Sequence, residues 1–201
     1  MTKEEKVVNY YVVCNKLKDV IRSGWLYFEV DRNRVESIAE HIYGVQMLAI
    51  AMKSEYEYDI DIIKVIFMLA IHELGEIIIG DFLPFQDNVD DKEKLEHEAV
   101  HKILSSLIDG KQIEELFLEF DKGETKEAKF AFQCDKLESD IQCKLYEQEG
   151  CVDLLKQAPK MKITSDDKNA WSKWFIGTHE YAYDENFMNV ANYIKNNNIG
   201  E

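Results

Sequence analysis

Glycine and proline are scarce in this chain of 201 residues, which contains nine glycines and two prolines. This excludes collagen-like and low-complexity chains, and the apolar residues, 46% of the total, are numerous enough to form a core. No apolar run approaches the roughly 18 residues of a membrane-spanning helix. The N-terminal residues MTKEEK lack the basic-then-apolar plan of a secretion signal. We therefore expect a cytoplasmic protein with no membrane partner, in which residues 1–201 form one domain.

Basic residues are also scarce, with 24 Lys and Arg against 39 Asp and Glu, a net charge of −15. Because binding to a nucleic-acid polymer depends on clustered positive charge, this balance argues against that class of partner. A small anionic substrate is still compatible, since a metal ion or a few local cations can dominate one pocket. The four cysteines show no C-x-x-C spacing and are expected to be free thiols.

Apolar residues recur at helical spacing along nearly the whole chain, and no segment alternates as a half-buried strand does. The expected fold class is all-α, a single-domain helical bundle. Its core is expected over about residues 14–150, followed by a C-terminal helical extension of about residues 160–201. The helices are expected at residues 7–21, 38–52, 61–79, 92–108, 113–120, 126–149, 166–176 and 185–194.

Some helix boundaries follow from single residues. Ser37, followed by a glutamate three residues later, has the spacing of a capping box, and Thr125 is suited to begin another helix. The segment 25–34 shows no clear period and is expected to be a loop. Pro84 and Pro159 also fall in expected loops.

The expected helix at 61–79 is apolar on all sides, as in a helix buried at the middle of a bundle. It nevertheless contains His72, Glu73 and Glu76. Burying an ionised carboxylate costs several kcal/mol unless the group is paired or binds a metal. These three residues therefore indicate a functional site inside the bundle.

Two further polar residues interrupt apolar helix faces. His41 lies between Ile38 and Val45 on the apolar stripe of its helix, and Asp135 lies on the inner face of the helix at 126–149. Each could singly be a hydrogen-bonded core residue. Together with the polar groups of the buried helix they favour a metal site, because mixed nitrogen and oxygen ligands suit Mn, Fe, Co or Zn.

Four segments in a fixed order carry a resemblance to a known family: 36–41 (ESIAEH), 71–76 (IHELGE), 80–81 (GD) and 133–136 (QCDK). This set resembles the HD-domain metal-dependent phosphohydrolases, and most closely their compact 5'-deoxynucleotidase-like members. The resemblance covers about residues 14–150. It implies an all-helical, often dimeric enzyme that removes phosphate from nucleoside monophosphates, here with deoxyribonucleotides as substrates, and needs a divalent metal ion.

The resemblance also implies roles for individual residues. Glu76 matches the catalytic carboxylate that positions or deprotonates the attacking water. Asp81 matches a carboxylate on the substrate side, with both a catalytic and a binding role, and Arg22 matches the arginine that holds the substrate phosphate. The metal ligands implied are His41, His72, Glu73 and Asp135.

The chain departs from the family pattern at one ligand, because the signature pair is His-Asp and here it is His72-Glu73. Glutamate is still a carboxylate ligand but reaches one methylene further. A degenerate, non-catalytic binding protein with the HD fold is therefore an alternative to the enzyme.

Residues 97–101 (HEAVH) form a literal H-E-x-x-H, the signature of zinc metalloproteases. On a helical wheel, however, His97 and His101 lie away from the apolar centre of their helix, which favours a solvated flank. The same position argues against a two-metal HD phosphodiesterase, in which added histidines hold a second metal ion.

The C-terminal part of the chain is rich in aromatic residues, among them Trp171, Trp174, Phe175 and Tyr181. Such spacing is typical of a core or of a subunit interface, and we expect a homodimer. A platform that stacks on a nucleobase is the alternative. His179 in this part has no partner that the sequence identifies.

Overall fold

The computed structural model describes residues 1–81, 92–161 and 168–200, and every regular element in these ranges is a helix. The all-α expectation is confirmed. One isolated antiparallel β-bridge joins Ile21 to Ser37. The helices are α1 (Lys3–Cys14), η1 (Asn15–Lys18), α2 (Ser23–Tyr27), α3 (Ile38–Glu55), α4 (Ile62–Ile71), α5 (Glu76–Ile79), α6 (Lys92–Leu104), α7 (Gly110–Lys122), α8 (Lys126–Gln148), α9 (Leu154–Met161), α10 (Ala170–His179), η3 (Glu180–Ala182) and α11 (Glu185–Asn196).

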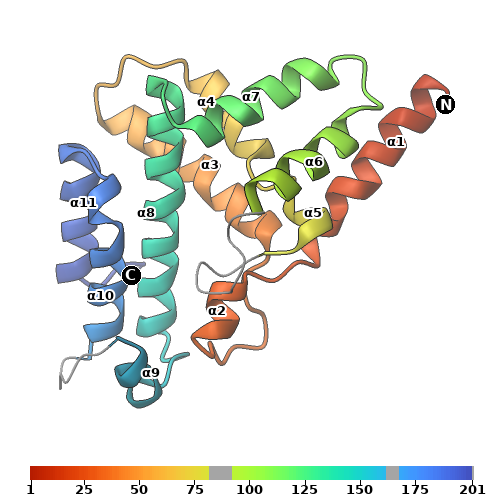
Figure 1. The fold of residues 1–201 in the computed structure, drawn as a ribbon. Helices are drawn as coiled ribbons and strands as arrows, with labels where there is room; N and C mark the ends of the chain where they lie inside the picture. Colours follow the sequence, from red (N-terminus) through yellow and green to blue (C-terminus); the bar gives the residue numbers. More distant parts are fainter. Residues whose placement is uncertain (82–91, 162–167, 201) are drawn as a thin grey trace.

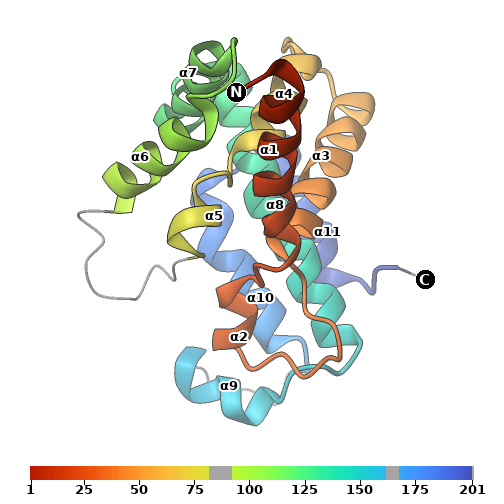
Figure 2. The ribbon, with the colours of Figure 1, turned by 90° about the vertical axis from the view of Figure 1, so that its right-hand side faces the viewer.

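The long helix α8 is the axis of the bundle (Figure 1). Helices α10 and α11 pack on one side of it, and α3 and α4 pack on the other, while α7 contacts its N-terminal part. Helix α1 lies at the edge of the molecule and has no buried residue (Figure 2). The main core forms where α3, α4, α8 and α11 meet, and it includes the buried side chains of Val45, Leu69, Phe130, Leu137 and Phe187.

Both predicted helix caps are present, and both lie on helices that carry polar core residues. The Ser37 hydroxyl accepts from the backbone N–H of Glu40 at 3.3 Å, and the Glu40 carboxylate accepts from the backbone N–H of Ser37 at 2.9 Å. The Thr125 hydroxyl accepts from the backbone N–H of Ala128 at 3.2 Å. These bonds satisfy donors that a helix start leaves unpaired, and they fix where α3 and α8 begin.

The expected helix at 61–79 is interrupted, which corrects the sequence-based prediction. It consists of α4 and α5 with a turn at 72–75 between them, in which the backbone N–H of Leu74 donates to the carbonyl of Ile71 at 3.1 Å. The turn packs closely on α6, because a Cβ at Gly75 would lie 2.5 Å from Cγ of Glu96. This contact with a helix some twenty residues later has no signature in the local apolar pattern.

Other boundaries differ as well. Helix α1 spans Lys3–Cys14 rather than 7–21, α2 lies partly inside the expected loop at 25–34, and α9 contains Pro159. Pro84 and the expected helix start at residue 166 lie outside the described residues. The four cysteines are free, as predicted. Within the described ranges, no helix has both the length and the apolar character needed to cross a bilayer. The division into a core and an extension remains a prediction.

Candidate metal centre and active site

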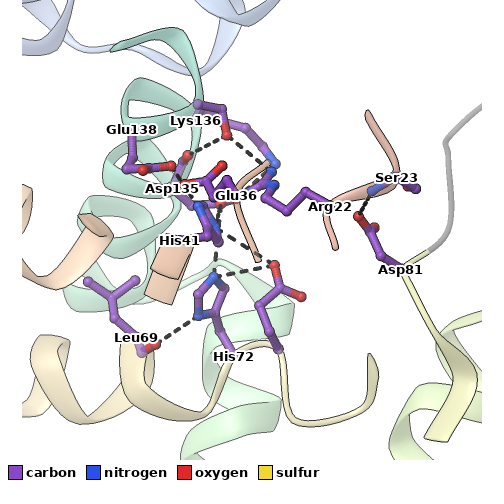
Figure 3. A network of polar contacts seen from close by, with 12 residues as sticks. Arg22, Ser23, Glu36, His41, Leu69, His72, Asp81, Asp135, Lys136 and Glu138 are labelled. Carbon is purple, nitrogen blue, oxygen red and sulfur yellow. Dashed lines mark hydrogen bonds and ion pairs between the residues drawn. The ribbon is translucent and has the colours of Figure 1, made fainter. Parts of the chain in front are cut away.

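Four of the predicted site residues converge from three parts of the chain. His41 comes from α3, His72 and Glu73 from the turn after α4, and Asp135 from α8. Each offers one ligand atom, and these four atoms lie within 4.8 Å of one another. Figure 3 shows the His41 ring above the His72 ring, with Asp135 beside them. The interruption of the helix lets two neighbouring residues face the same point.

His72 is oriented by its own helix. Its Nδ1 lies 2.8 Å from the carbonyl oxygen of Leu69, and because a carbonyl only accepts, Nδ1 carries the proton. Its buried Nε2 has no hydrogen-bond partner among the described residues. That atom lies 3.5 Å from Oε1 of Glu73 and 3.9 Å from Oδ1 of Asp135. Burial lowers the pKa of His72, so the ring is neutral and presents a lone pair to the cluster.

His41 is fully buried between two carboxylates of α8. Its Nδ1 lies 2.6 Å from Oε2 of Glu138, and its Nε2 lies 3.0 Å from Oδ1 of Asp135. Burial and Arg22 oppose a charge on this ring, but the two carboxylates raise the pKa of His41 to about 9. A carboxylate behind a histidine is the common arrangement for a metal-ligating ring, because it holds a proton at Nδ1. A metal ion at Nε2 would displace the proton that this atom shares with Asp135.

The two carboxylates of the cluster are ionised. Although burial opposes it, Lys136 and His41 hold the pKa of Asp135 well below its usual range. The pKa of Glu73 is also lowered, again against burial, because the charged His41 lies 3.9 Å from its Oε1. The orphaned Nε2 of His72 and this N2O2 donor set fit a divalent ion of the Mn, Fe, Co or Zn type.

The cluster opens into a cavity of about 550 Å³. The end of the cavity at which Glu73 and Asp135 lie, called the metal end below, also carries two cationic side chains. Lys136 Nζ donates to Oδ2 of Asp135 at 2.8 Å. Arg22 Nη2 donates to the Ser139 hydroxyl at 3.2 Å, while its Nη1 is buried without a partner in the described ranges. The cavity is lined by Arg22, Ser23, Gly24, Tyr27, Phe28, Glu73, Glu76, Asp81, Lys92, Asp135, Lys136, Ser139, Trp174, Phe175, Thr178 and His179.

The backbone around Arg22 is held to the start of α3. The N–H of Arg22 donates to the carbonyl of Glu36 at 3.1 Å, and the N–H of Ile38 donates to the carbonyl of Val20 at 2.8 Å. These bonds flank the Ile21–Ser37 bridge. The predicted phosphate-binding arginine is therefore fixed relative to the helix that carries His41.

Glu76 and Asp81, the two predicted catalytic or substrate-side carboxylates, both line the cavity. Burial, followed by the charges of Glu73 and Asp81, raises the pKa of Glu76 to about 11. Its buried Oε2 has no hydrogen-bond partner among the described residues. Asp81 accepts from the backbone N–H of Ser23 at 2.6 Å, which anchors α2 beside the cavity (Figure 3). A cation bound by Glu73 would weaken the repulsion that raises the pKa of Glu76.

Unsatisfied buried polar atoms are concentrated at this cavity. In the described residues, six buried side-chain nitrogen or oxygen atoms have no hydrogen-bond partner, and four of them belong to cavity or ligand residues. Those four are Arg22 Nη1, Ser23 Oγ, His72 Nε2 and Glu76 Oε2. Because buried polar groups in native proteins are nearly always paired, this concentration is the mark of a binding site.

Several residues of the site were not assigned a role from the sequence. Glu138 lies three residues after Asp135 on the same helix face, so the helical pattern could have shown it, whereas Lys136 is the next residue and is not found by that pattern. The aromatic residues of the C-terminal part have different surroundings. Trp171 is buried in a core cluster, whereas Trp174 and Phe175 line the cavity. The sequence spacing of these aromatic residues, which favoured an interface or a core, did not distinguish the buried residue from those that line the cavity.

The two histidines of the H-E-x-x-H segment do not converge on one point. His97 Nε2 lies 2.9 Å from Oδ2 of Asp121, and His101 Nδ1 lies 3.0 Å from Oε2 of Glu114. Both partners belong to α7 and are two helical turns apart. His97 also groups with Glu93 and Asp121 in a more exposed cluster that shares no residue with the buried one. A zinc protease or a two-metal phosphodiesterase would need His97 and His101 to face a metal ion together, and the structure does not bring them together.

A model of the HD domain family matches residues 14–172, and the chain therefore belongs to the HD domain family of phosphohydrolases. Among curated proteins, the 5'-deoxynucleotidase HDDC2 of Dictyostelium discoideum is 32% identical over 151 residues, 71% of this chain and 78% of that protein. The 5'-deoxynucleotidase hdd1 of Schizosaccharomyces pombe is 31% identical over 73% of this chain and 75% of its own.

Solved structures show the same fold. The PH0347 protein of Pyrococcus horikoshii has a TM-score of 0.70 and 24% identity, over 94% of this chain and 98% of its own. A protein of Magnetospirillum magnetotacticum, described as a predicted metal-dependent phosphohydrolase, has a TM-score of 0.71 and 24% identity, over 96% of this chain and 93% of its own.

Proposed function

We propose that this protein is a metal-dependent phosphomonoesterase that releases phosphate from nucleoside 5'-monophosphates, with deoxyribonucleotides as its substrates. The observation that carries the proposal is the convergence of His41, His72, Glu73 and Asp135 beside a cavity that Glu73, Asp135, Arg22 and Lys136 line. The relatives named as 5'-deoxynucleotidases support the nucleotide and its sugar.

The four converging residues would hold the divalent ion, which supplies Lewis-acid activation of a phosphoryl oxygen and of the attacking water. Arg22 neutralises charge on the phosphoryl group, because its unpaired Nη1 is a buried donor in the same cavity. Lys136 adds a second positive charge at the edge of the cluster. Glu76 positions the water or exchanges its proton through the oxygen that lacks a partner.

Phosphate release from a panel of ribo- and deoxyribonucleoside monophosphates tests the proposal, with Mn²⁺, Co²⁺ or Zn²⁺ added and with chelator as the control. We expect metal-dependent release that favours the deoxy sugar. Release that persists after chelation would contradict the metal role. Bound metal with no turnover of any phosphoester would favour the degenerate binding protein, and Glu73→Asp, which restores the family pair, would then be the variant to compare.

We further propose that the protein is a cytoplasmic homodimer. Exposed aromatic side chains on the C-terminal part support this, since Tyr181 is 78% exposed and Tyr193 is 60% exposed. Light scattering on the purified protein tests it, and a mass near 23.5 kDa would refute it.

A further inference from the structure

The cavity has a second end that the phosphate chemistry does not use. Its metal end is polar, with Glu73 and Asp135, whereas Phe28 of the α2 C-cap and Trp174 and Phe175 of α10 line it elsewhere. We propose that this aromatic wall is a nucleobase subsite, in which Phe175 packs on the base and His179 forms a hydrogen bond with its polar edge. The proposal rests on the nucleotidase function and adds how the base is held.

The spacing along α8 fits a nucleotide that extends from the metal centre. His179 contacts Asp140, which follows Asp135 by five residues, a rise of roughly 7.5 Å along the helix. A phosphate group held at Asp135 does not span this offset. A ligand that reaches both ends must carry further groups beyond its phosphate, as the sugar and base of a nucleotide do.

Phe175 is held rigidly from several sides. Its ring centroid lies 5.7 Å from that of Trp25, 6.0 Å from that of Phe28 and 5.0 Å from that of His179. The side chain is nevertheless only partly buried and faces the cavity. A fixed aromatic surface of this kind suits a flat base, because stacking needs little ordering of the protein when the base binds.

His179 has a polar atom left for the ligand. Its Nδ1 lies 2.7 Å from Oδ1 of Asp140, whose other oxygen accepts from the Tyr183 hydroxyl at 2.5 Å. Asp140 is completely buried, whereas the His179 side chain keeps 19% of its surface exposed and lines the cavity. In the described part of the chain Nε2 forms no hydrogen bond. Asp140 therefore fixes the ring and leaves Nε2 as the atom that meets the base edge.

The test compares two ligands that share phosphate and sugar and differ only in the base: a deoxynucleoside monophosphate and 2-deoxyribose 5-phosphate. Dissociation constants are measured by tryptophan fluorescence with chelator present, so that neither ligand is turned over, and kcat/KM is measured with metal. In the wild-type protein the nucleotide should bind at least about tenfold more tightly, the scale expected for one stacked base.

The variants are His179→Ala and Phe175→Leu, and each should weaken nucleotide binding by about tenfold while leaving deoxyribose phosphate unchanged. His101→Ala is the matched control, because it removes another histidine–carboxylate pair, on the exposed side of α6, and should change neither ligand. If Phe175→Leu unfolds, His179→Ala alone decides the question.

Equal weakening of both ligands, or no weakening, would overturn the base subsite, as would a wild-type protein that binds both ligands equally. These outcomes are distinct from failure of the proposed function. If no nucleotide releases phosphate, the dissociation constants still show whether the base contributes to binding.

Discussion

The position of Gly44 on α3 makes one prediction that links packing to the metal centre. A Cβ built at Gly44 would lie 2.6 Å from Oε1 and 3.2 Å from Cδ of Glu138. Contacts this short do not persist, so Glu138 must move in a Gly44→Ala variant. The Glu138 carboxylate is also the partner of His41 Nδ1 at 2.6 Å through its other oxygen, Oε2, and we expect the displacement to break the bond that orients this ring.

The expected size of the effect follows from two opposing contributions. Replacing glycine by alanine inside a helix stabilises the fold by about 1 kcal/mol. Losing a buried charge-assisted hydrogen bond costs about 1.5–3 kcal/mol. The free energy of unfolding should therefore fall by about 0.5–2 kcal/mol in Gly44→Ala. Metal affinity should fall by about 10- to 100-fold, as when a ligating histidine loses its carboxylate partner.

Urea unfolding and metal titration measure the two effects. The matched control is Gly177→Ala in α10, where an added Cβ has no neighbour within 4 Å. That variant should be stabilised by up to about 1 kcal/mol through helix propensity and should bind metal as the wild-type protein does. If Gly44→Ala behaves like Gly177→Ala in both measurements, Glu138 does not support His41 and the reasoning is refuted.

Three further predictions concern the site and its surroundings. Glu76→Gln should retain bound metal but lower kcat by about 10²- to 10⁴-fold, and near wild-type turnover would remove Glu76 from the chemistry. Mn²⁺ at a thousandfold excess over its Kd should raise the free energy of unfolding of the wild-type protein by about 4 kcal/mol, seen as a higher urea midpoint. It should not stabilise His72→Ala. An equal shift in both would place the ion elsewhere. Burial and the charge of Asp140 raise the pKa of Tyr183, so the folded protein keeps a proton that the unfolded chain releases above about pH 10. Stability should fall as the pH rises through that range, and Tyr183→Phe should flatten the slope in urea melts; an unchanged slope would assign it to other groups.

The polar residues that the fold brings together could be selected from the sequence because each is out of place in its own helix. His41 interrupts an apolar stripe, and His72 and Glu73 stand in a segment that is otherwise apolar on all sides. Burying such a group without a partner is costly in any fold, so its presence on an apolar face indicates a partner or a metal before the fold is known. Reasoning from single helices was therefore enough to single out these residues together with Glu76, and the family resemblance then separated the four implied ligands from Glu76.

The features that escaped prediction depend on distant partners. At the turn 72–75, Gly75 packs closely against Glu96 of α6. Helix α2 begins where the backbone N–H of Ser23 meets Asp81, 58 residues later in the chain. His179 had no visible partner because Asp140 lies 39 residues before it. Contacts of this kind are set by the tertiary fold, and no local period or propensity records them.

The residues that α10 contributes to the cavity lie in a different stretch of the chain from the metal centre. The metal centre, with Arg22 and Lys136, uses residues between 22 and 136, inside the segment that matches the HD domain family. Of the proposed base subsite, Phe28 also lies inside that segment, whereas Trp174, Phe175 and His179 lie beyond its last matched residue, 172. If the aromatic wall holds the base as we propose, substitutions in α10 would alter ligand preference without changing the residues of the metal centre. In evolutionary terms, the proposed subsite would let base preference change while the metal centre stays intact, and α10 would be the segment to randomise in directed evolution of a new preference.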